Sequence, residues 1–220
     1  MRIPAILLAA GASRRLGHPK QLVHVDGETL LARTMRMAHE AGAEPVFVVL
    51  GGNQASIEAV VDFSQAIRVS NANWEQGIAT SICAGVEAVQ VFCPEADAVL
   101  ILVCDQPFLT AAHLRSLIEI CGRAGSVSIV ASGYKGVAGI PAIFPKAYFA
   151  ELRALTGDTG AKVILRSHEH ELAWVDLEGG DFDIDSPADL ATLTAGIAEA
   201  PERMLSTILS DDSDPCEPHT

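Results

Sequence analysis

The sequence predicts an α/β protein in three layers: a mostly parallel, Rossmann-like sheet with helices on both faces. Apolar runs of strand length alternate with segments of helical periodicity along the first 130 residues, an order typical of βαβ units. The runs are continuously apolar, as in strands buried on both sides of a parallel sheet. With 220 residues, 49% of them hydrophobic and 5% aromatic, the chain is long enough for one domain with an aliphatic core.

The predicted strands are short apolar runs that end at turn residues. The run 98–103 is the most hydrophobic of them, and it ends abruptly at Cys104-Asp105-Gln106-Pro107. A hairpin or flap is expected at 133–139. In chain order, strands are predicted at 3–8, 45–50, 67–69, 98–103, 128–131, 142–144 and 172–175.

Helices are predicted between these strands. Gly42 ends the first, Thr110 caps the fourth, and Ser186 with Pro187 begins the last, because proline is tolerated in a first helical turn. One domain is predicted over residues 1–198, followed by an acidic tail, 199–220, that is not expected to pack. The helices are expected at 28–41, 55–62, 78–91, 110–123, 146–155 and 157–166, with the last one starting at 186.

Four polar or small residues come directly after predicted strands: Gly11, Gly51, Asn71 and Asp105. The carboxyl ends of parallel strands meet at one edge of a sheet, where ligands of such proteins bind. We therefore expect these four residues to line one rim.

The loop after the first strand combines glycine with positive charge. Gly11 and Gly17 alternate there with Arg14, Arg15 and Lys20, in a chain whose net charge is −13. Glycine lets backbone N–H groups approach an anion closely, and the cations attract it. The spacing matches neither G-x-x-x-x-G-K-[ST] nor G-x-G-x-x-G. The loop predicts binding of a phosphorylated small molecule, with a solvated turn as the alternative.

Two acidic segments are candidates for a metal site. Asp105 follows a buried strand, where a carboxylate is costly unless a cation such as Mg²⁺ pairs with it; a turn-forming aspartate is the alternative. In the segment 182–190, Asp183 and Asp185 would point the same way on an extended chain. Asp183 and Asp189 are interpreted as helix-start and surface charges.

Residues 8–22 closely resemble the signature loop of the MobA-like nucleotidyltransferases, L-A-A-G-x-S-x-R-M-G-x-x-K-x-L, with Leu16 in place of methionine. Further segments resemble the family's N-x-x-[WY]-x-x-G-x-x-x-S-[IL] at 71–82, G-D-x-G-[AS]-[RK] at 157–162 and D-[IV]-D-[ST]-P-x-D at 183–189. Ile140 departs from the commonest form of the acceptor segment. The resemblance spans roughly residues 3–197 and implies the nucleotide-diphospho-sugar transferase fold.

The resemblance also implies roles for individual residues. Asp105 and Asp185 become ligands of Mg²⁺, and Arg15, Lys20 and Asp105 become catalytic residues. Trp74 is open to two interpretations, stacking on a base or pterin and packing beside a helix. Acceptor binding is implied for Gly139, Pro141 and Asp158; for Asp158, at a predicted helix start, an N-cap is the alternative. Nucleotide binding is implied for Ala9, Ala10, Gly11, Ala12, Ser13, Arg15, Lys20, Gly51, Asn71, Gly77 and Ser81.

The implied reaction is Mg²⁺-dependent transfer of a nucleoside monophosphate from an NTP to a phosphorylated acceptor, with release of pyrophosphate. The resemblance implies molybdopterin as the acceptor, and L-A-A-G is more like the cytidylyl than the guanylyl branch, which favours CTP over GTP. A sugar or polyol phosphate is the alternative acceptor. A non-catalytic chaperone that hands a cofactor to a molybdenum-hydroxylase client is the alternative function.

Composition limits the other possibilities. An acidic chain lacks the basic face expected of a general nucleic-acid binder. No apolar run approaches the ~20 residues that span a bilayer, and the N-terminus does not match a signal peptide. The five cysteines are widely spaced and odd in number. This cysteine pattern predicts reduced thiols and a cytoplasmic protein. The short apolar runs predict that the protein does not associate with a membrane.

Overall fold

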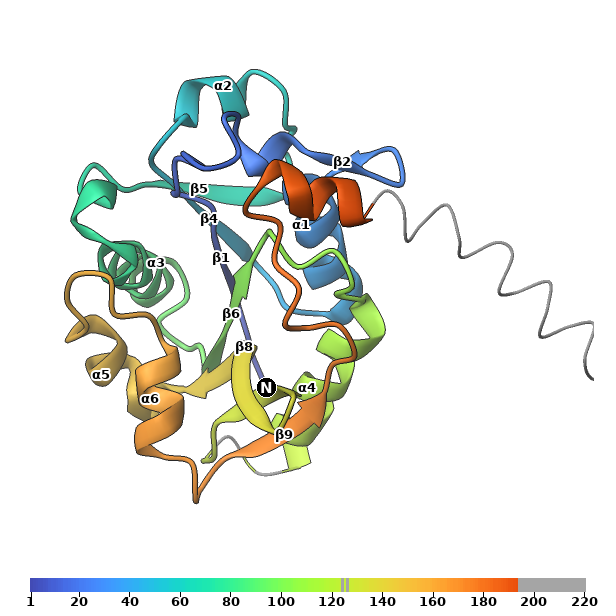
Figure 1. Cartoon of the computed structure of the whole chain (residues 1–220). Helices are drawn as coiled ribbons and strands as arrows, with labels where there is room; N and C mark the ends of the chain where they lie inside the picture. Colours follow the sequence, from blue (N-terminus) through green and yellow to red (C-terminus); the bar gives the residue numbers. More distant parts are fainter. Residues whose placement is uncertain (124, 126, 194–220) are drawn as a thin grey trace, which may run out of the picture.

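The computed structural model describes residues 1–123, 125 and 127–193 (Figure 1). Over these residues the main sheet has seven strands in the order β5-β4-β1-β6-β8-β7-β9, and a separate hairpin joins β2 to β3. The bounds are β1 (Ala5–Leu8), β2 (His24–Val25), β3 (Glu28–Thr29), β4 (Val46–Leu50), β5 (Ala66–Ser70), β6 (Ala98–Val103), β7 (Val130–Tyr134), β8 (Val137–Pro145) and β9 (Ala173–Asp176).

The sheet is parallel from β5 through β4 and β1 to β6, as the apolar runs predict. Strand β8 is antiparallel to both of its neighbours, β6 and β7, while β9 is again parallel to β7. The insertion of β8 next to β6 brings the later part of the chain beside the rim of the first four strands. The predicted class, a mostly parallel three-layer sheet, is confirmed.

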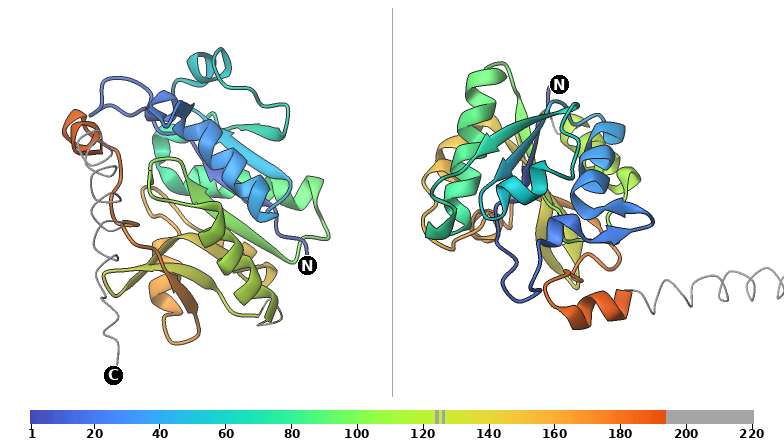
Figure 2. Two further views of the ribbon diagram at one scale, coloured as in Figure 1. Left: turned by 90° about the vertical axis from the view of Figure 1, so that its right-hand side faces the viewer. Right: turned by 90° about the horizontal axis from the view of Figure 1, so that it is seen from above.

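Helices cover the sheet on two faces (Figures 1 and 2). One face packs against α1 and α4, the other against α3, α5 and α6. The bounds are α1 (Leu30–Ala41), α2 (Gln54–Glu58), α3 (Ile78–Phe92), α4 (Ala111–Arg123), α5 (Phe149–Arg153) and α6 (Lys162–Ser167), with short 3-10 helices η1 (Lys20–Leu22), η2 (Trp74–Gln76) and η3 (Lys146–Tyr148).

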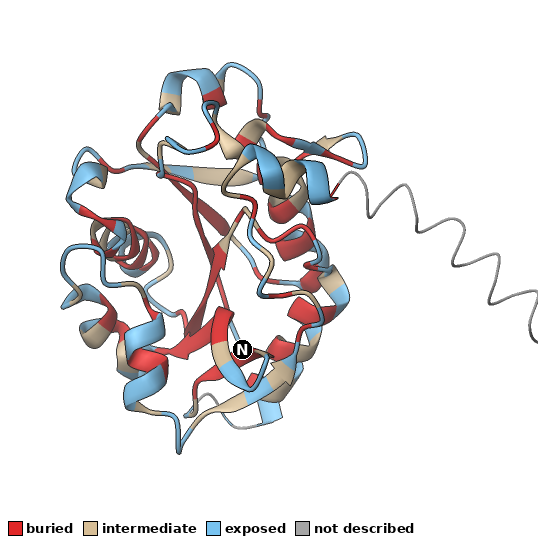
Figure 3. Ribbon diagram, viewed as in Figure 1, coloured by how far each residue is buried: buried red, intermediate tan, exposed pale blue. Residues whose placement is uncertain are grey.

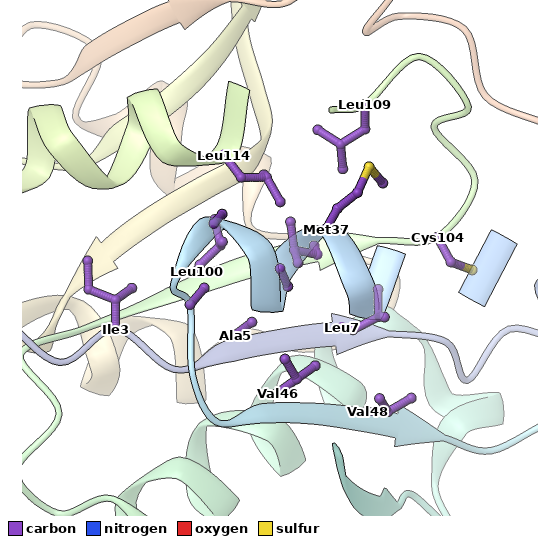
Figure 4. Close-up of a cluster of buried hydrophobic side chains, with 14 of the residues drawn as sticks. Ile3, Ala5, Leu7, Met37, Val46, Val48, Leu100, Cys104, Leu109 and Leu114 are labelled. Atoms are coloured by element: carbon purple, nitrogen blue, oxygen red, sulfur yellow. The ribbon is translucent and has the colours of Figure 1, made fainter. Parts of the chain in front are cut away.

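Alternate side chains of each strand supply the two halves of the core. In β1, Ala5 and Leu7 join one cluster, and Ile6 and Leu8 join the other. Figure 4 shows the first cluster, and Figure 3 shows that the central strands are buried along most of their length. This two-sided burial is the physical reason for the continuous apolar runs in the sequence.

Several element boundaries differ from the prediction. The helix expected from residue 28 begins at Leu30, with Thr29 as its cap; the Thr29 hydroxyl accepts a hydrogen bond from Ala32 N (3.2 Å). Residues 28–29 instead form β3, because Asp26 and Gly27 both adopt positive φ. Asp-Gly is a strong two-residue hairpin signal. The strand predicted at 142–144 is the end of the longer β8.

The last described residues pack against the N-terminal loop. Residues 187–193 are helical, as Ser186 and Pro187 predict. A third apolar cluster joins this helix to the loop and hairpin, through Leu16, Val23, Val25, Leu30, Ile184 and Leu193. The predicted boundary at 198 and the predicted acidic tail lie outside the described residues. In the part of the chain that is described, no helix has the length and apolarity to cross a membrane.

Candidate functional site

Among the described residues, two adjoining cavities open at the carboxyl ends of β1 and β6. The first cavity, of about 430 Å³, is lined by the start of the N-terminal loop, Lys20, Trp74 and the N-terminal end of α3. The second cavity, of about 310 Å³, is lined mainly by apolar side chains of β1, β6, β8 and α3. Both cavities share the same wall residues: Leu8, Ile78, Val103, Asp105 and Asp158.

The N-terminal loop turns its carbonyl groups toward the protein. Buried Gln21 donates from Nε2 to the carbonyls of Ala9 (2.7 Å) and Gly11 (2.9 Å). The carbonyls of Ala10, Ala12 and Ser13 accept hydrogen bonds from elsewhere in the chain. Within the described residues, the N–H groups from 11 to 15 donate to no acceptor. Successive unpaired N–H groups of this kind form an anion-binding concavity.

Two features keep the loop open on its outer side. Ser13 adopts a φ of 54°, and its hydroxyl accepts from Lys20 N (3.0 Å), which ties the two ends of the loop together. Gly11 lines the first cavity, and a Cβ added there would meet no protein atom within 4 Å. The missing side chain at 11 therefore leaves space that a ligand could use.

Lys20 links two carboxylates that are 80 positions apart in the sequence. Its ammonium donates to Asp105 Oδ2 and to Asp185 Oδ1 (2.9 Å), and Arg15 Nη2 binds the other oxygen of Asp185 (2.6 Å). Burial alone would lower the pKa of Lys20, but the charge of Asp105 and hydrogen bonds to both carboxylates outweigh it and raise that pKa. Lys20 is therefore a permanent cation.

Asp185 is held at this position by its neighbours in the chain. Ile184 is fully buried in the third apolar cluster, and its N–H donates to the carbonyl of Asp105 (2.9 Å). Asp189 Oδ2 accepts from the N–H groups of Asp185 (3.1 Å) and Ser186 (2.7 Å), the helix-start role that the sequence predicts. Partial burial raises the pKa of Asp185, but hydrogen bonds and charge from Lys20 and Arg15 prevail and lower it.

The residues around Lys20 fit a divalent cation. Asp105 Oδ1 is buried and has no hydrogen-bond partner among the described residues, so this oxygen has an unmet need for a donor or metal. Asp105 and Asp185 already share one cation, and Mg²⁺ is usually held by one or two carboxylates together with waters and phosphate oxygens. The described residues contain no cluster of three or more acidic, histidine or cysteine ligands, so an ion held here would take its remaining ligands from water or a bound phosphate.

The second cavity contains charged and polar groups to which the sequence assigned no role in a binding site. Asp183, Gln106, Tyr134 and Lys162 all line it. Desolvation, with the nearby charge of Asp105, raises the pKa of Asp183 to about 6, although the residue as a whole is exposed. Asp183 is an exposed charge, as the sequence predicts, and it also lines this cavity. Its alternation with Asp185 was the available signal, since both lie on one side of an extended segment.

The predicted site residues fall into two groups. One group lines the first cavity: Ala9, Ala10, Gly11, Lys20, Gly77, Ser81, Asp105 and Asp158. The other lines neither cavity: Ala12, Ser13, Arg15, Gly51, Asn71, Gly139, Pro141 and Asp185. Trp74 lines the first cavity and also packs on Gly51, where an added Cβ would lie 2.6 Å from the Trp74 Cβ.

Several residues of the second group hold neighbouring residues in place through hydrogen bonds or close packing. Asn71 donates from Nδ2 to the hydroxyls of Thr80 (2.9 Å) and Ser81 (3.0 Å), which orients Ser81 on the cavity wall. A side chain at Gly139 would collide with the Tyr134 hydroxyl. The carbonyl of Pro141 accepts from Ser132 (2.7 Å). These contacts give the rim its shape without reaching a cavity.

Gly77 joins the wall shared by the two cavities. It adopts a φ of 110°, and an added Cβ would collide with Gly157 and lie 2.6 Å from Asp158 N. Ala79 N donates to the Gly157 carbonyl (3.1 Å). The bare backbone at 77 therefore lets the start of α3 meet the 157–158 loop, which places Asp158 between the cavities.

The sequence matches known proteins over most of its length. Residues 5–172 match the family model described as the MobA-like NTP transferase domain. The purine catabolism protein PucB of Bacillus subtilis is 29% identical over 204 residues, 86% of this chain and 96% of PucB. Nicotine blue oxidoreductase of Paenarthrobacter nicotinovorans is 30% identical over 171 residues, 74% and 81% of the two chains. A probable molybdenum cofactor guanylyltransferase of Opitutus terrae is 31% identical over 137 residues, 61% and 63%.

Solved structures show the same similarity. The crystal structure of Rv0371c from Mycobacterium tuberculosis aligns with a TM-score of 0.78 at 30% identity, over 88% of this chain and 97% of that one. A crystal structure of Rv0371c in complex with manganese aligns with a TM-score of 0.72 at 28% identity, over 88% and 98%. Molybdopterin-guanine dinucleotide biosynthesis protein A from Archaeoglobus fulgidus aligns with a TM-score of 0.62 at 17% identity over 90% of this chain and 100% of that one, and shows the shared fold alone.

Proposed function

The chain belongs to the MobA-like NTP transferase family, and from this premise we propose that it catalyses nucleotidyl transfer. The donor is an NTP, the acceptor is a phosphorylated small molecule, and pyrophosphate is released. The observation that supports this most directly is the group around Lys20: one ammonium between Asp105 and Asp185, beside a loop whose N–H groups have no partner in the described chain. A protein that only carried a cofactor would not need this arrangement.

In this proposal the NTP lies in the first cavity. The N–H groups of residues 11–15 donate to its phosphates, with Arg15 and Lys20 adding positive charge. The remaining residues around the nucleotide are those that the family resemblance implies: Ala9, Ala10, Gly51, Asn71, Gly77 and Ser81. Gly51 and Asn71 act through Trp74 and Ser81, which line the cavity.

Asp105 and Asp185 would hold Mg²⁺, which when bound would offset the negative charge on the reacting phosphates. An oxygen of the acceptor phosphate attacks the α-phosphorus of the NTP, the bond to the β-phosphate breaks, and pyrophosphate leaves. An anionic phosphate needs no general base, so the protein contributes positioning and charge neutralisation. Lys20 moves from the two carboxylates to the phosphates as charge develops there.

The acceptor lies in the second cavity, with Gly139 and Pro141 shaping its wall and Asp158 between the cavities. We propose molybdopterin as the acceptor and CTP as the donor. A relative named probable molybdenum cofactor guanylyltransferase supports the acceptor, and the L-A-A-G sequence of the loop supports CTP over GTP. A cytoplasmic location and a molybdenum-enzyme client belong to the same proposal.

The test is pyrophosphate release from CTP, GTP, ATP and UTP, with and without molybdopterin, in the presence of Mg²⁺. The proposal predicts release that requires molybdopterin and is fastest with CTP. Turnover with a sugar or polyol phosphate in place of molybdopterin would identify the other acceptor class. Tight binding of molybdopterin without release from any NTP would show a cofactor-carrying chaperone and refute catalysis.

A further inference from the structure

The main sheet ends at β9, whose outer edge has no partner strand in the described part of the chain (Figure 1). On its inner side β9 pairs with β7, and the N–H groups of Ala173 (3.0 Å) and Leu177 (2.8 Å) donate to carbonyl groups on that side. Successive peptide groups of a strand point in opposite directions. The N–H and C=O groups of Trp174 and Asp176 therefore point away from β7, where a further strand could pair with them.

Strand β9 lacks several features that usually protect a sheet edge. Edge strands are commonly blocked by proline, by lysine or by a bulge. The sequence of β9 is Ala-Trp-Val-Asp, and its register with β7 is continuous. Trp174 is 49% exposed, and its ring lies close to the backbone of Gly133, where an added Cβ would approach it to 3.3 Å. The edge is thus regular and partly apolar.

An open groove of about 680 Å³ begins where β9 ends. Asp176 and Glu178 line it, together with the aromatic ring of the exposed Phe108. His113 also lines it, but burial lowers the pKa of His113, so this side chain is neutral at neutral pH. Among the described residues, no lysine or arginine lines the groove. The groove therefore suits a cationic side chain, with its stem against Phe108 and its charge toward the two carboxylates.

The chain on both sides of the edge is acidic. Residues 169–178 include Glu169, Glu171, Asp176 and Glu178 and neither lysine nor arginine. None of these four carboxylates forms an ion pair in the described part of the chain. A second copy would bring the same carboxylates to the edge, and the chain's own segment 194–220 is also acidic. Like charges that face each other weaken an interface, so the edge favours a basic partner.

We propose that β9 and the groove at its end dock an extended, basic segment of a partner protein. The segment adds a strand to the sheet through the outward peptide groups of Trp174 and Asp176. One of its lysine or arginine side chains enters the groove. Trp174 and Glu178 line neither of the two cavities, so the inference does not depend on nucleotidyl transfer.

The probe is a short capped peptide of alternating arginine and valine, titrated into the full chain by calorimetry at neutral pH and low salt. One control peptide has glutamate in place of arginine. The other has every backbone nitrogen methylated, which keeps the charges and removes the N–H donors. We expect only the unmodified peptide to bind. At saturation, hydrogen exchange at the Trp174 and Asp176 amides should slow about tenfold or more, whereas the Ala173 amide, which already donates toward β7, should change little.

Glu178→Lys tests the charge of the groove, and Glu119→Lys is its matched control. Glu119 lies on α4, does not line the groove, and its replacement changes the net charge equally. Glu178→Lys should weaken binding of the unmodified peptide about fivefold, and Glu119→Lys should weaken it about twofold or less. Equal effects would mean that the peptide responds only to the net charge of the chain.

Trp174→Pro tests the edge, because it removes one outward N–H and leaves the hydrogen bonds to β7 in place. It should weaken peptide binding about tenfold or more, whereas Trp174→Thr, which keeps the N–H, should stay within about threefold. Thermal melting verifies that both variants are folded. If Trp174→Pro does not fold, the methylated peptide decides whether the edge pairs.

Four results would overturn the inference: no binding of the unmodified peptide, equal binding of the methylated peptide, no slowing of exchange at Trp174, or equal effects of Glu178→Lys and Glu119→Lys. A concentration-dependent dimer that Trp174→Pro abolishes, measured by analytical ultracentrifugation, would also overturn it, because a second copy would then occupy the edge. Pyrophosphate release should stay within about twofold in every variant. Its loss in Glu178→Lys would assign this surface to the active site and overturn the inference, whereas its absence in the unmodified chain would refute only the proposed function.

Discussion

The two cavities differ in how the chain builds them. The first takes its free N–H groups and Lys20 from one contiguous stretch, residues 9–21, while Trp74, the start of α3 and the end of β6 complete its wall; Lys20 is already paired with Asp105 and Asp185. The second is assembled from segments of β6, β8, the 158–162 loop and the 183 region, and within the described part of the chain Asp183 on its wall forms no ion pair. A contiguous motif prepares the anion-binding side, whereas the other side exists only when distant segments pack together.

This difference predicts separable consequences of mutation. A change in the N-terminal loop should affect the nucleotide and leave the second cavity intact. A change in the shared wall should affect both cavities and the stability of the fold. Substitutions in the loop, in the shared wall and at the metal ligands therefore separate effects on ligand binding from effects on the fold.

Lys20→Ala should reduce turnover about 10²-fold or more, the size of loss seen when a single electrostatic group is removed from an active site. Steady-state pyrophosphate release with CTP, molybdopterin and Mg²⁺ measures it. Arg68→Ala is the control, because Arg68 lines neither cavity and pairs with Glu58, at 3.4 Å. It should alter turnover about twofold or less. Near-normal turnover in Lys20→Ala would remove the lysine from the mechanism.

Gly77→Ala should destabilise the protein by about 2 kcal/mol, because the Cβ would collide with Gly157 and the φ of 110° is unfavourable for alanine. Urea denaturation measures the change. Gly160→Ala is the control in the adjacent loop: its Cβ would meet Ile78 at an ordinary 3.8 Å, and the cost should be about 0.5 kcal/mol or less. Equal stability of the two variants would show that the contact between Gly77 and Gly157 can relax at no cost in free energy.

Asp185→Asn should raise the Mg²⁺ concentration for half-maximal turnover by about tenfold, because ligand charge sets the affinity for hard cations. Removal of the metal with a chelator should abolish turnover, and Mn²⁺ should restore it. Asp189→Asn is the control, since Asp189 caps the following helix and hydrogen-bonds to neither Lys20 nor Arg15. If both variants show the same metal dependence as the unmodified chain, the assignment of Asp185 as a metal ligand is wrong.

Gly11→Ala should weaken CTP binding about fivefold while leaving the melting temperature unchanged. The added Cβ meets no protein atom within 4 Å, so its effect falls on the ligand, and a lost phosphate hydrogen bond costs about 1 kcal/mol. Calorimetric titration of CTP with Mg²⁺ gives the affinity. A drop in stability without a change in affinity would place the constraint at Gly11 inside the protein and not at the ligand.

The first cavity was largely predictable because its information is local. Turn chemistry, glycine and nearby cations mark the loop at 9–20, and β1 and β6 are readable from continuous apolar runs. The rim that these strands form follows from the parallel order alone. Gly51 and Asn71 show the limit of that reasoning, because both follow a strand yet act through Trp74 and Ser81.

By itself, the sequence determined the three-layer class, the strand and helix order and the basic loop, since periodicity and turn preference act over a few residues. Only the tertiary structure decided that Asp105 and Asp185 meet at Lys20, and that Asp183 and Gln106 face a common cavity. The antiparallel strand β8 beside β6 and the burial of Ile184 bring these residues together. Such contacts depend on how apolar surfaces pack across the whole domain, which no short stretch of chain can specify.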